Sequence, residues 1–343
     1  MAPTREWHWV REHCYALTRS RWPRDSVASV TKTKARRTTA GEYNPRQSCP
    51  CGSGKRYKAC HGDPGGAQDV IVSRPFAGLA AECQLVALRE FVPSATAPLP
   101  LPQPAGRDIA LATVLPTAAA AIVRPDGTAL VGLQVLTRSG DLSRDLGRAV
   151  SWALTAEPGS VLPKVSTTAE GEQIRLQDLL VPDMPLDVTM YRDFAWWIPG
   201  DEPPSGEAAQ SIQRANSAIM PTEAVTGQGV DSAYWVDAGE KAHLRWVRPE
   251  PEEQLLTALA RLAARDELSL GDGSRYAGSF RAHGVLVPVW DLDREQHPRE
   301  WVAPAEAFAQ RLAQALDSLD STPLTDAERR SARGLRGRQI TLR

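Results

Sequence analysis

The sequence predicts an α+β fold, a body of antiparallel β-hairpins that are each followed by a helix. Three times along the chain, two short apolar runs flank a turn and precede a segment whose apolar residues recur at helical spacing. A hydrophobic share of 42% and a charged share of 24% are typical of an ordinary globular chain. The length of 343 residues favours about two domains with tails.

The first unit pairs residues 118–124 with 128–136 across a Pro-Asp-Gly turn at 125–127. A helix follows, with Asp141 as the expected N-cap, and it ends before Pro158. Its apolar face consists of Leu142, Leu146, Ala149, Val150, Ala153 and Leu154.

The second unit pairs residues 232–237 with 241–248, and the third pairs 276–281 with 285–291 across the turn at 282–284. Each precedes a segment with one apolar helical face. These faces consist of Leu255, Leu256, Leu259, Leu262 and Ala263 in the second unit and of Phe308, Leu312, Leu316 and Leu319 in the third. The units share too few identical residues to count as a repeat.

Composition sets the expected boundaries of the body. A stretch rich in proline and glycine at 199–206 separates a first α+β half, 70–198, from a second, 207–320. The proline-rich segment 94–106 predicts a stiff, extended connector. A capping box opens a basic C-terminal helix or tail over 325–343, which is either solvated or in contact with RNA.

The net charge of -1 conceals a basic N-terminus. Residues 1–58 contain 13 Lys or Arg and 4 Asp or Glu, a balance of +9, so the remainder carries -10. Within this region, residues 1–47 lack periodicity and predict a disordered head. Such a head either meets an anionic partner, whether nucleic acid, ribosome or an acidic protein face, or is simply solvated.

The sequence gives no sign of export or membrane insertion. Its longest nearly apolar run, residues 109–123, is 15 residues long, is broken by Pro116, and is too short to span a bilayer. The N-terminus lacks the apolar stretch and cleavage site of a signal peptide. We therefore expect a cytoplasmic protein without a membrane span.

The cysteines predict a metal site. Five of them, an odd number without a secretion signal, argue against a disulfide framework. A C-x-C-x8-C-H array supplies three thiolates and an imidazole, which together form a closed tetrahedral set for one structural Zn²⁺. The expected ligands are Cys49, Cys51, Cys60 and His61.

Local chemistry supports this small N-terminal zinc knuckle. Pro50 restricts the backbone between the first two ligands, and Gly52 and Gly54 allow a tight fold that brings backbone N–H groups toward the thiolates. Three thiolates leave the zinc site with a charge of about -1, which the adjacent basic residues offset. A segment this short cannot bury a core, so zinc would supply most of its folding free energy.

Residues 49–62 resemble the SEC-C motif, the zinc-binding tail of the SecA preprotein translocase ATPase, so we assign a SEC-C-like knuckle to residues 48–63. In SecA this tail contacts the chaperone SecB and the ribosome. The resemblance implies the same four metal ligands and a partner-binding surface formed by Lys55, Arg56, Tyr57 and Lys58. The chain lacks the Walker motifs of the translocase motor, so neither that activity nor SecB binding carries over.

The body resembles an uncharacterised actinobacterial family in which a SEC-C motif precedes a domain of unknown function. The resemblance is carried by Arg-Pro-Phe-Ala-Gly-Leu at 74–79, by residues 82–93 and by Asp-Leu-Ser-Arg-Asp-Leu at 141–146. It implies no activity.

Candidate chemistry within the body is sparse. Asp291, Asp293 and Glu295 alternate and could bind a hard cation, although acids at such a position more often belong to a turn. His243 and His283 have no nucleophile or acid at an interpretable spacing.

Two apolar features of the body also need an interpretation. Phe194, Trp196 and Trp197 are either a binding platform or core residues of a strand. Cys83 lies in a predicted helix and is interpreted as a buried apolar residue.

Three functions remain open. The first is a zinc-binding adaptor whose knuckle docks on an anionic protein or ribosomal partner. The second is an enzyme of unknown reaction that the knuckle recruits. The third is a protein that binds nucleic acid through its basic ends.

Overall fold

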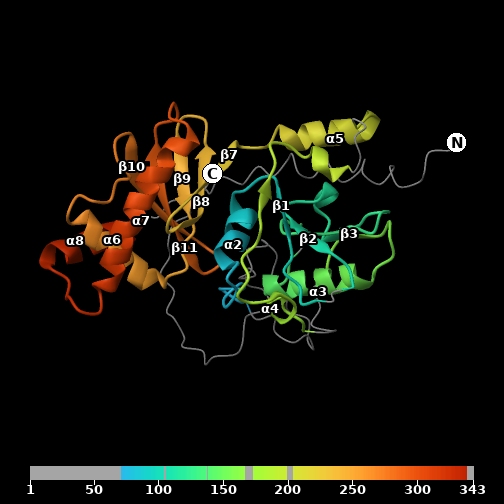
Figure 1. Cartoon of the computed structure of the whole chain (residues 1–343), viewed down its shortest axis with the longest axis horizontal. Coiled ribbons are helices and arrows are strands. Elements are labelled where there is room, and N and C mark those ends of the chain that lie inside the picture. The colour runs from blue at the N-terminus through green and yellow to red at the C-terminus, as the bar shows by residue number, and fades with distance from the viewer. Residues whose placement is uncertain (1–70, 104–105, 137, 167–172, 199–203, 338–343) are drawn as a thin grey trace, which may run out of the picture.

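The structure, a computed structural model, describes residues 71–103, 106–136, 138–166, 173–198 and 204–337 (Figure 1). It therefore describes most of the body. The basic head at 1–47 and the knuckle at 48–63 lie outside the described residues.

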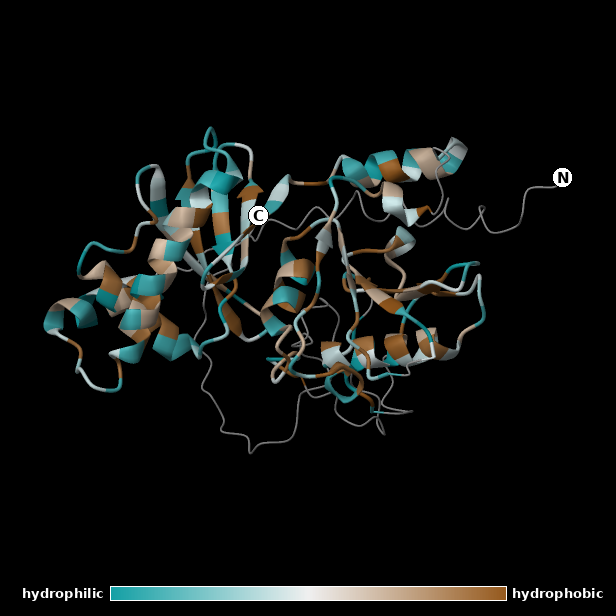
Figure 2. Ribbon diagram, in the orientation of Figure 1, coloured by the Kyte–Doolittle hydropathy of each residue, from teal (hydrophilic) through white to brown (hydrophobic). Residues whose placement is uncertain are grey.

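The first half of the body forms a six-stranded sheet in the order β5-β3-β4-β2-β1-β6. Its strands are β1 (Ala95–Pro98), β2 (Ile109–Ala112), β3 (Ala121–Val123), β4 (Ala129–Gly132), β5 (Val161–Leu162) and β6 (Thr189–Met190). The pair β2 and β4 is parallel, and the other pairs are antiparallel. Helix α3 (Leu142–Thr155) contacts β2, β3 and β4, and its hydrophobic and hydrophilic residues alternate along its length (Figure 2).

The second half forms a five-stranded antiparallel sheet in the order β10-β11-β9-β8-β7. Its strands are β7 (Thr222–Gly227), β8 (Val230–Asp237), β9 (Ala242–Trp246), β10 (Ser274–Ala282) and β11 (Val285–Leu292). Helices α6 (Glu252–Ala263) and α7 (Val302–Asp317) share a hydrophobic core with one face of this sheet.

Shorter elements complete the body. They are α4 (Leu176–Leu179), α5 (Gly206–Asn216), α8 (Asp326–Arg336) and the 3-10 turns η4 (Pro116–Ala118), η5 (Ala195–Trp197) and η6 (Pro298–Trp301). In the parts of the chain that the structure describes, no helix combines the length and the apolar character that a membrane span requires.

The three predicted hairpins are confirmed, and so are the helices that follow them. The turn at 125–127 joins β3 to β4, with the Arg124 amide donating to the Thr128 carbonyl over 2.8 Å. Asp141 caps α3, because its carboxylate accepts from the Ser143 and Arg144 amides. The second and third hairpins share one continuous sheet, since β9 pairs with β11.

Two features of the first sheet differ from the expectation. The segment 94–106 contains a sheet strand, β1, whereas its prolines predicted a connector. Pro98 is the last residue of that strand and lies beyond its pairing with β6, so on that side it is at an edge where a missing amide donor is tolerated. The parallel pairing of β2 with β4 departs from the expected antiparallel hairpins. On either side of this pair the pairing is antiparallel, because β1 pairs with β2 and β3 pairs with β4.

Helix α2 (Glu82–Glu90) lies between the two sheets (Figure 1). Its buried Leu85, Val86 and Leu88 belong to a hydrophobic core that includes residues of both sheets. Phe91 ends the helix, and its ring centroid lies 5.7 Å from that of Tyr234 and 6.5 Å from that of Phe280, both in the second sheet. The sheets thus share one core across the predicted division at 199–206, which itself stays a prediction.

A second core lies between the second sheet and its helices. It is built around aromatic side chains, with the ring centroids of Trp290 and Phe308 5.0 Å apart and those of Tyr276 and Trp290 5.5 Å apart. The Trp290 indole donates to the Leu268 carbonyl over 2.8 Å, so its one polar atom is satisfied.

A buried ion pair attaches α8 to this core. Arg261 of α6 is 1% exposed, and its Nε lies 3.0 Å from Oε1 of Glu328 in α8. The same guanidinium donates to the Ser318 hydroxyl and, over 2.8 Å, to the Thr322 carbonyl. Glu328 also accepts from the Thr325 amide, which confirms the predicted capping box. A single arginine therefore holds both α8 and the loop before it.

We expect Glu328→Ala to lower the free energy of unfolding by about 3 kcal/mol, because it leaves the Arg261 charge buried without its counterion. Arg336→Ala removes the exposed ion pair with Glu253 and should cost less than about 1 kcal/mol. Urea unfolding of both variants tests this, and equal losses would contradict the role of the buried pair.

Candidate functional site

The expected zinc ligands lie outside the described residues, as do the residues of the expected partner surface. The ligands are Cys49, Cys51, Cys60 and His61, and the surface residues are Lys55, Arg56, Tyr57 and Lys58. Three soft thiolates with one imidazole suit Zn²⁺ and would form a closed set without a position for substrate. Within the described ranges, no group of three or more His, Cys, Asp or Glu residues could hold a metal.

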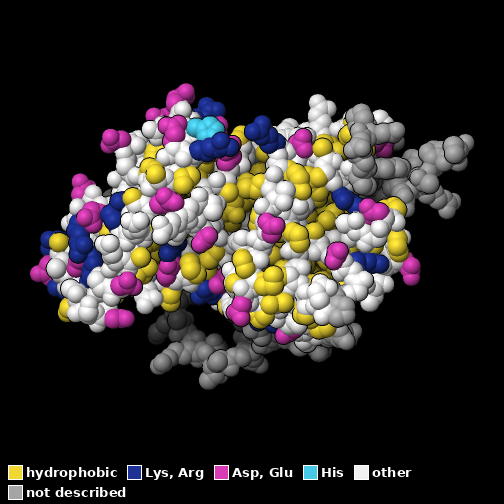
Figure 3. Space-filling model, in the orientation of Figure 1, with side chains coloured by type: hydrophobic (Ala, Val, Ile, Leu, Met, Phe, Trp, Pro, Cys, Tyr) yellow, Lys and Arg dark blue, Asp and Glu magenta, His cyan; other side chains and the backbone are white. Residues whose placement is uncertain are grey.

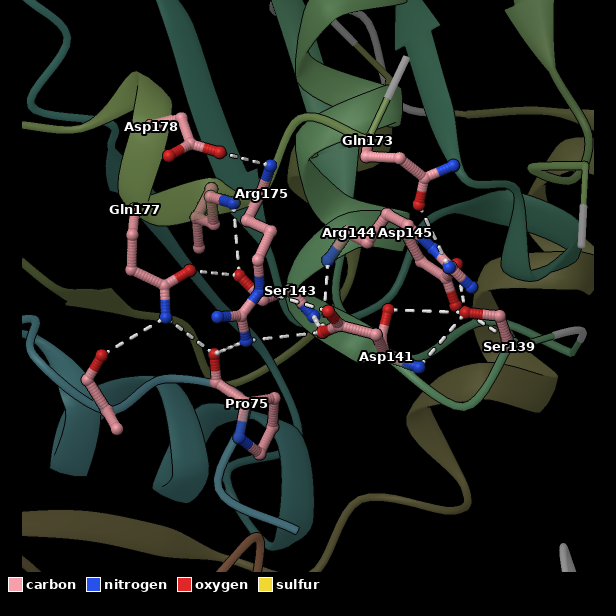
Figure 4. Close-up of polar contacts among 12 residues, drawn as sticks. Pro75, Ser139, Asp141, Ser143, Arg144, Asp145, Gln173, Arg175, Gln177 and Asp178 are labelled. Carbon is pink, nitrogen blue, oxygen red and sulfur yellow. Dashed lines mark hydrogen bonds and ion pairs between the residues drawn. The ribbon is translucent and has the colours of Figure 1, made fainter. Parts of the chain in front are cut away.

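A cluster of polar side chains lies at the N-terminus of α3 (Figure 4). Asp141 is 8% exposed, and its carboxylate accepts the Ser143 amide at 3.1 Å while Oδ2 lies 2.9 Å from Nε of Arg175. Asp145 is 4% exposed and accepts both the amide and the hydroxyl of Ser139, each at 2.7 Å. Both buried carboxylates are therefore stabilised by donors.

The same cluster joins three segments that are distant in sequence. The Gln177 amide nitrogen donates to the Pro75 carbonyl over 2.7 Å, and Arg175 reaches the same carbonyl over 3.2 Å. The Ser143 hydroxyl accepts from the Leu176 amide over 3.0 Å and donates to the Gln177 side chain (Figure 4). Residues 74–79 and 141–146, which carry the family resemblance, thus meet here.

This arrangement is structural. The Ser143 hydroxyl is engaged by a backbone amide and by a side-chain amide, and no imidazole of the described residues contacts it to act as a base. The carboxylates cap a helix and hold a loop, so neither is free to accept a substrate proton. The cluster positions α4 and residues 75–77 against α3.

The alternating acids do not form a cation site. Asp291 lies on β11, and its Oδ2 is 2.8 Å from both Nζ of Lys241 and Nη2 of Arg275. Asp293 accepts the Glu295 amide at 3.0 Å, as turn acids do. Burial raises the pKa of Asp291, but hydrogen bonds from Arg275 and Lys241 outweigh it and leave that pKa below its ordinary value.

The two histidines lie in different environments. His243 is in β9, with Nδ1 3.4 Å from Oδ1 of Asp291, and burial together with nearby Arg245 lowers its pKa. His283 lies in the β10–β11 turn with φ 46°, and its Nε2 lies 2.7 Å from Oε1 of Glu90 at the end of α2. That hydrogen bond lowers the pKa of Glu90. Neither histidine contacts a nucleophile in the contacts that the structure describes.

Of the aromatic group, Phe194 is buried, whereas Trp196 and Trp197 are half-buried and lie in the 3-10 turn η5, not in a strand. Phe194 precedes η5, and its ring centroid lies 4.5 Å from that of Trp197. The indole nitrogens of Trp196 and Trp197 donate to the Ser94 hydroxyl over 2.9 Å and to the Val114 carbonyl over 3.0 Å. Trp196 packs against a small cluster on the face of the first sheet away from α3.

The remaining candidates carry little chemistry. Cys83 is partly buried, and burial raises the pKa of its thiol to about 12, so it is not a thiolate at neutral pH.

A cavity of about 380 Å³ opens between α6, β10 and α8, lined by Leu268, Tyr276, Leu335 and Asp266 among others. The guanidinium of Arg275, which also lines it, is engaged by Asp291.

The arginines of α8 are partly neutralised. Arg329 lies 2.7 Å from Asp326, and Arg336 pairs with Glu253 of α6. Arg338 and Arg343 lie outside the described residues. The positive charge that α8 can offer to RNA is therefore smaller than its composition indicates.

Sequence reasoning overlooked Arg245. It lies in β9 between Leu244 and Trp246 and is only 5% exposed. The signal in the sequence is the alternation of side chains along the strand. Leu244 and Trp246 point to one face, so Arg245 points to the other face, which α2 covers.

Comparison with known families assigns both parts of the chain. A model described as a family of unknown function (DUF5926) matches residues 75–343, and the SEC-C motif model matches residues 46–63. No solved structure matches the chain.

We expect Gly147→Ala to disrupt the polar cluster, because a Cβ there would lie 2.9 Å from the Arg175 carbonyl carbon and closer still to the Ile174 carbonyl oxygen. The loss in unfolding free energy should be about 1–3 kcal/mol, as for an overpacked core.

Gly334→Ala in α8 is the matched control. A Cβ there meets nothing within 4 Å, so helix propensity should raise stability by up to about 1 kcal/mol. Thermal unfolding measures both variants. A Gly147→Ala protein as stable as the control would show that the approach of residues 174–175 to α3 is not tight.

Proposed function

Since the chain belongs to the family of unknown function DUF5926 and carries a SEC-C motif ahead of that body, we propose that it is a zinc-binding interaction protein. In this proposal the knuckle binds one structural Zn²⁺ and docks on an anionic protein or ribosomal partner in the cytoplasm. The observation that carries the proposal is the SEC-C match at residues 46–63, whose donor set suits zinc.

Zinc has an energetic role in this proposal. The knuckle is too short to bury an apolar core, so metal binding and folding would be one event, contributing roughly 10 kcal/mol as in isolated zinc-finger peptides. Chelation would then unfold the motif and remove the docking surface. The body buries two extensive hydrophobic cores of its own and would remain folded.

Docking would use the basic residues within the motif. Lys55, Arg56 and Lys58 lie between the second and third ligands, with Tyr57 among them, so a folded knuckle would present them on one small surface. Such a surface favours an acidic protein face or ribosomal RNA through electrostatic complementarity. Its binding should weaken at high salt.

Features of the body make the alternative functions less favourable. The described polar clusters have their carboxylates engaged by donors, which argues against an enzyme that uses them as acid or base. Two arginines of α8 are paired with acids, which argues against nucleic-acid binding through that helix.

The triple variant Lys55→Glu, Arg56→Glu, Lys58→Glu tests the docking surface. We expect one zinc per chain by elemental analysis, as in the wild type, and loss of the partner in co-sedimentation with ribosomes and in pull-downs. Cys60→Ser should lose both zinc and partner.

Charge reversal at Arg330 and Arg333 of α8 is the control and should leave partner binding unchanged. A triple variant that keeps its partners would refute the docking surface, and a wild type without zinc would refute the metal site.

A further inference from the structure

Arg245 is a buried arginine without a counterion. Only Arg245 and Arg261 are buried among the arginines that the structure describes. Arg261 has Glu328, a hydroxyl and a carbonyl as partners. Arg245 makes no hydrogen bond or ion pair with any described residue, and its Nε is buried without a partner.

The surroundings of Arg245 follow from the sheet register. Leu244 and Trp246 point into the core beneath α6 and α7, so Arg245 points to the opposite face, toward α2. On that face it lies beside Tyr234 of β8 and Val289 of β11. Its guanidinium carbon lies 5.8 Å from the centroid of the Phe91 ring.

Charges nearby do not compensate for the Arg245 guanidinium. Burial lowers its pKa, and no acid contributes to that shift. Asp291 lies on the same face but is engaged by Lys241 and Arg275. The pKa of His243, two residues along β9, is lowered by burial and by Arg245 itself. The site therefore has one uncompensated positive charge in a largely apolar setting. Such a buried charge lowers the stability of the folded protein as long as no anion is bound beside it.

The guanidinium is nevertheless accessible at one edge. The Nε atom of Arg245 is buried and has no hydrogen-bond partner. Neither Nη atom is both buried and unpartnered, so the outer edge of the guanidinium reaches the surface. Arg245 lies on the face of the second sheet that packs against α2, beside residues of the core that both sheets share. Figure 3 shows hydrophobic side chains at the surface in the middle of the molecule.

We propose that Arg245 is the recognition residue of a binding site for a small carboxylate. A carboxylate matches the planar guanidinium in a bidentate pair and supplies the single negative charge that the site lacks. The buried side chains of Phe91, Tyr234 and Val289 lie beside Arg245, and this largely apolar wall would contact the hydrocarbon part of an organic acid. A phosphate dianion would leave one excess negative charge in the same apolar setting.

Ligand binding to the wild type is the first test. The probes are acetate, benzoate and inorganic phosphate, compared at equal ionic strength. Carboxylates should raise the melting temperature saturably and shift the ¹H–¹⁵N signal of the Arg245 Nε–H, and benzoate should bind more tightly than acetate because of the apolar wall. Absence of any such shift, or tighter binding of phosphate, would overturn the proposal.

Variants separate recognition from packing. Arg245→Met should lower carboxylate affinity at least about tenfold and be no less stable than the empty wild type, because it removes an unpaired buried charge. Arg245→Lys keeps the charge without the fork and should also bind more weakly. Arg336→Met, which removes an exposed arginine elsewhere, should bind like the wild type. An Arg245→Met or Arg245→Lys protein with wild-type affinity would contradict the site.

Discussion

The burial of α2 between two sheets is the constraint on which the rest of the body depends. Each sheet has one face covered by its own helices, and the apolar residues of α2 join the first core to the second sheet through Tyr234, Val236 and Phe280. Leu85, Val86 and Leu88 would expose apolar surface in either half alone. The hydrogen bonds from His283 to Glu90 and from Arg74 to Glu82 hold the ends of the same helix.

This construction bears on function. The body buries hydrophobic cores of its own, whereas in the proposed function a motif of about fifteen residues would depend on zinc to fold. The proposed function therefore combines a docking motif that depends on metal with a body that folds without it. The described polar clusters stabilise the fold of the body. Arg245 is a buried residue of that body whose charge has no counterion among the described residues.

Local patterns predicted the local structure well. A cap at Asp141, a Pro-Asp-Gly turn and alternating strands depend on neighbours in sequence, and each was confirmed. Long-range pairing was not predictable: prolines concealed β1, and the parallel pairing of β2 with β4 depends on residues about twenty apart. Arg245 escaped attention because its burial depends on α2, more than 150 residues away. The predicted metal ligands depend on spacing within a motif that lies outside the described residues, so that assignment stays a prediction.

Hydrogen exchange at increasing denaturant concentration, read separately for peptides from the two sheets, tests the shared core most directly. The account predicts that β2 and β4 lose protection at the same denaturant concentration as β9 and β11, because α2 belongs to one core with both. Two separate midpoints, with one sheet protected after the other has exchanged, would contradict it.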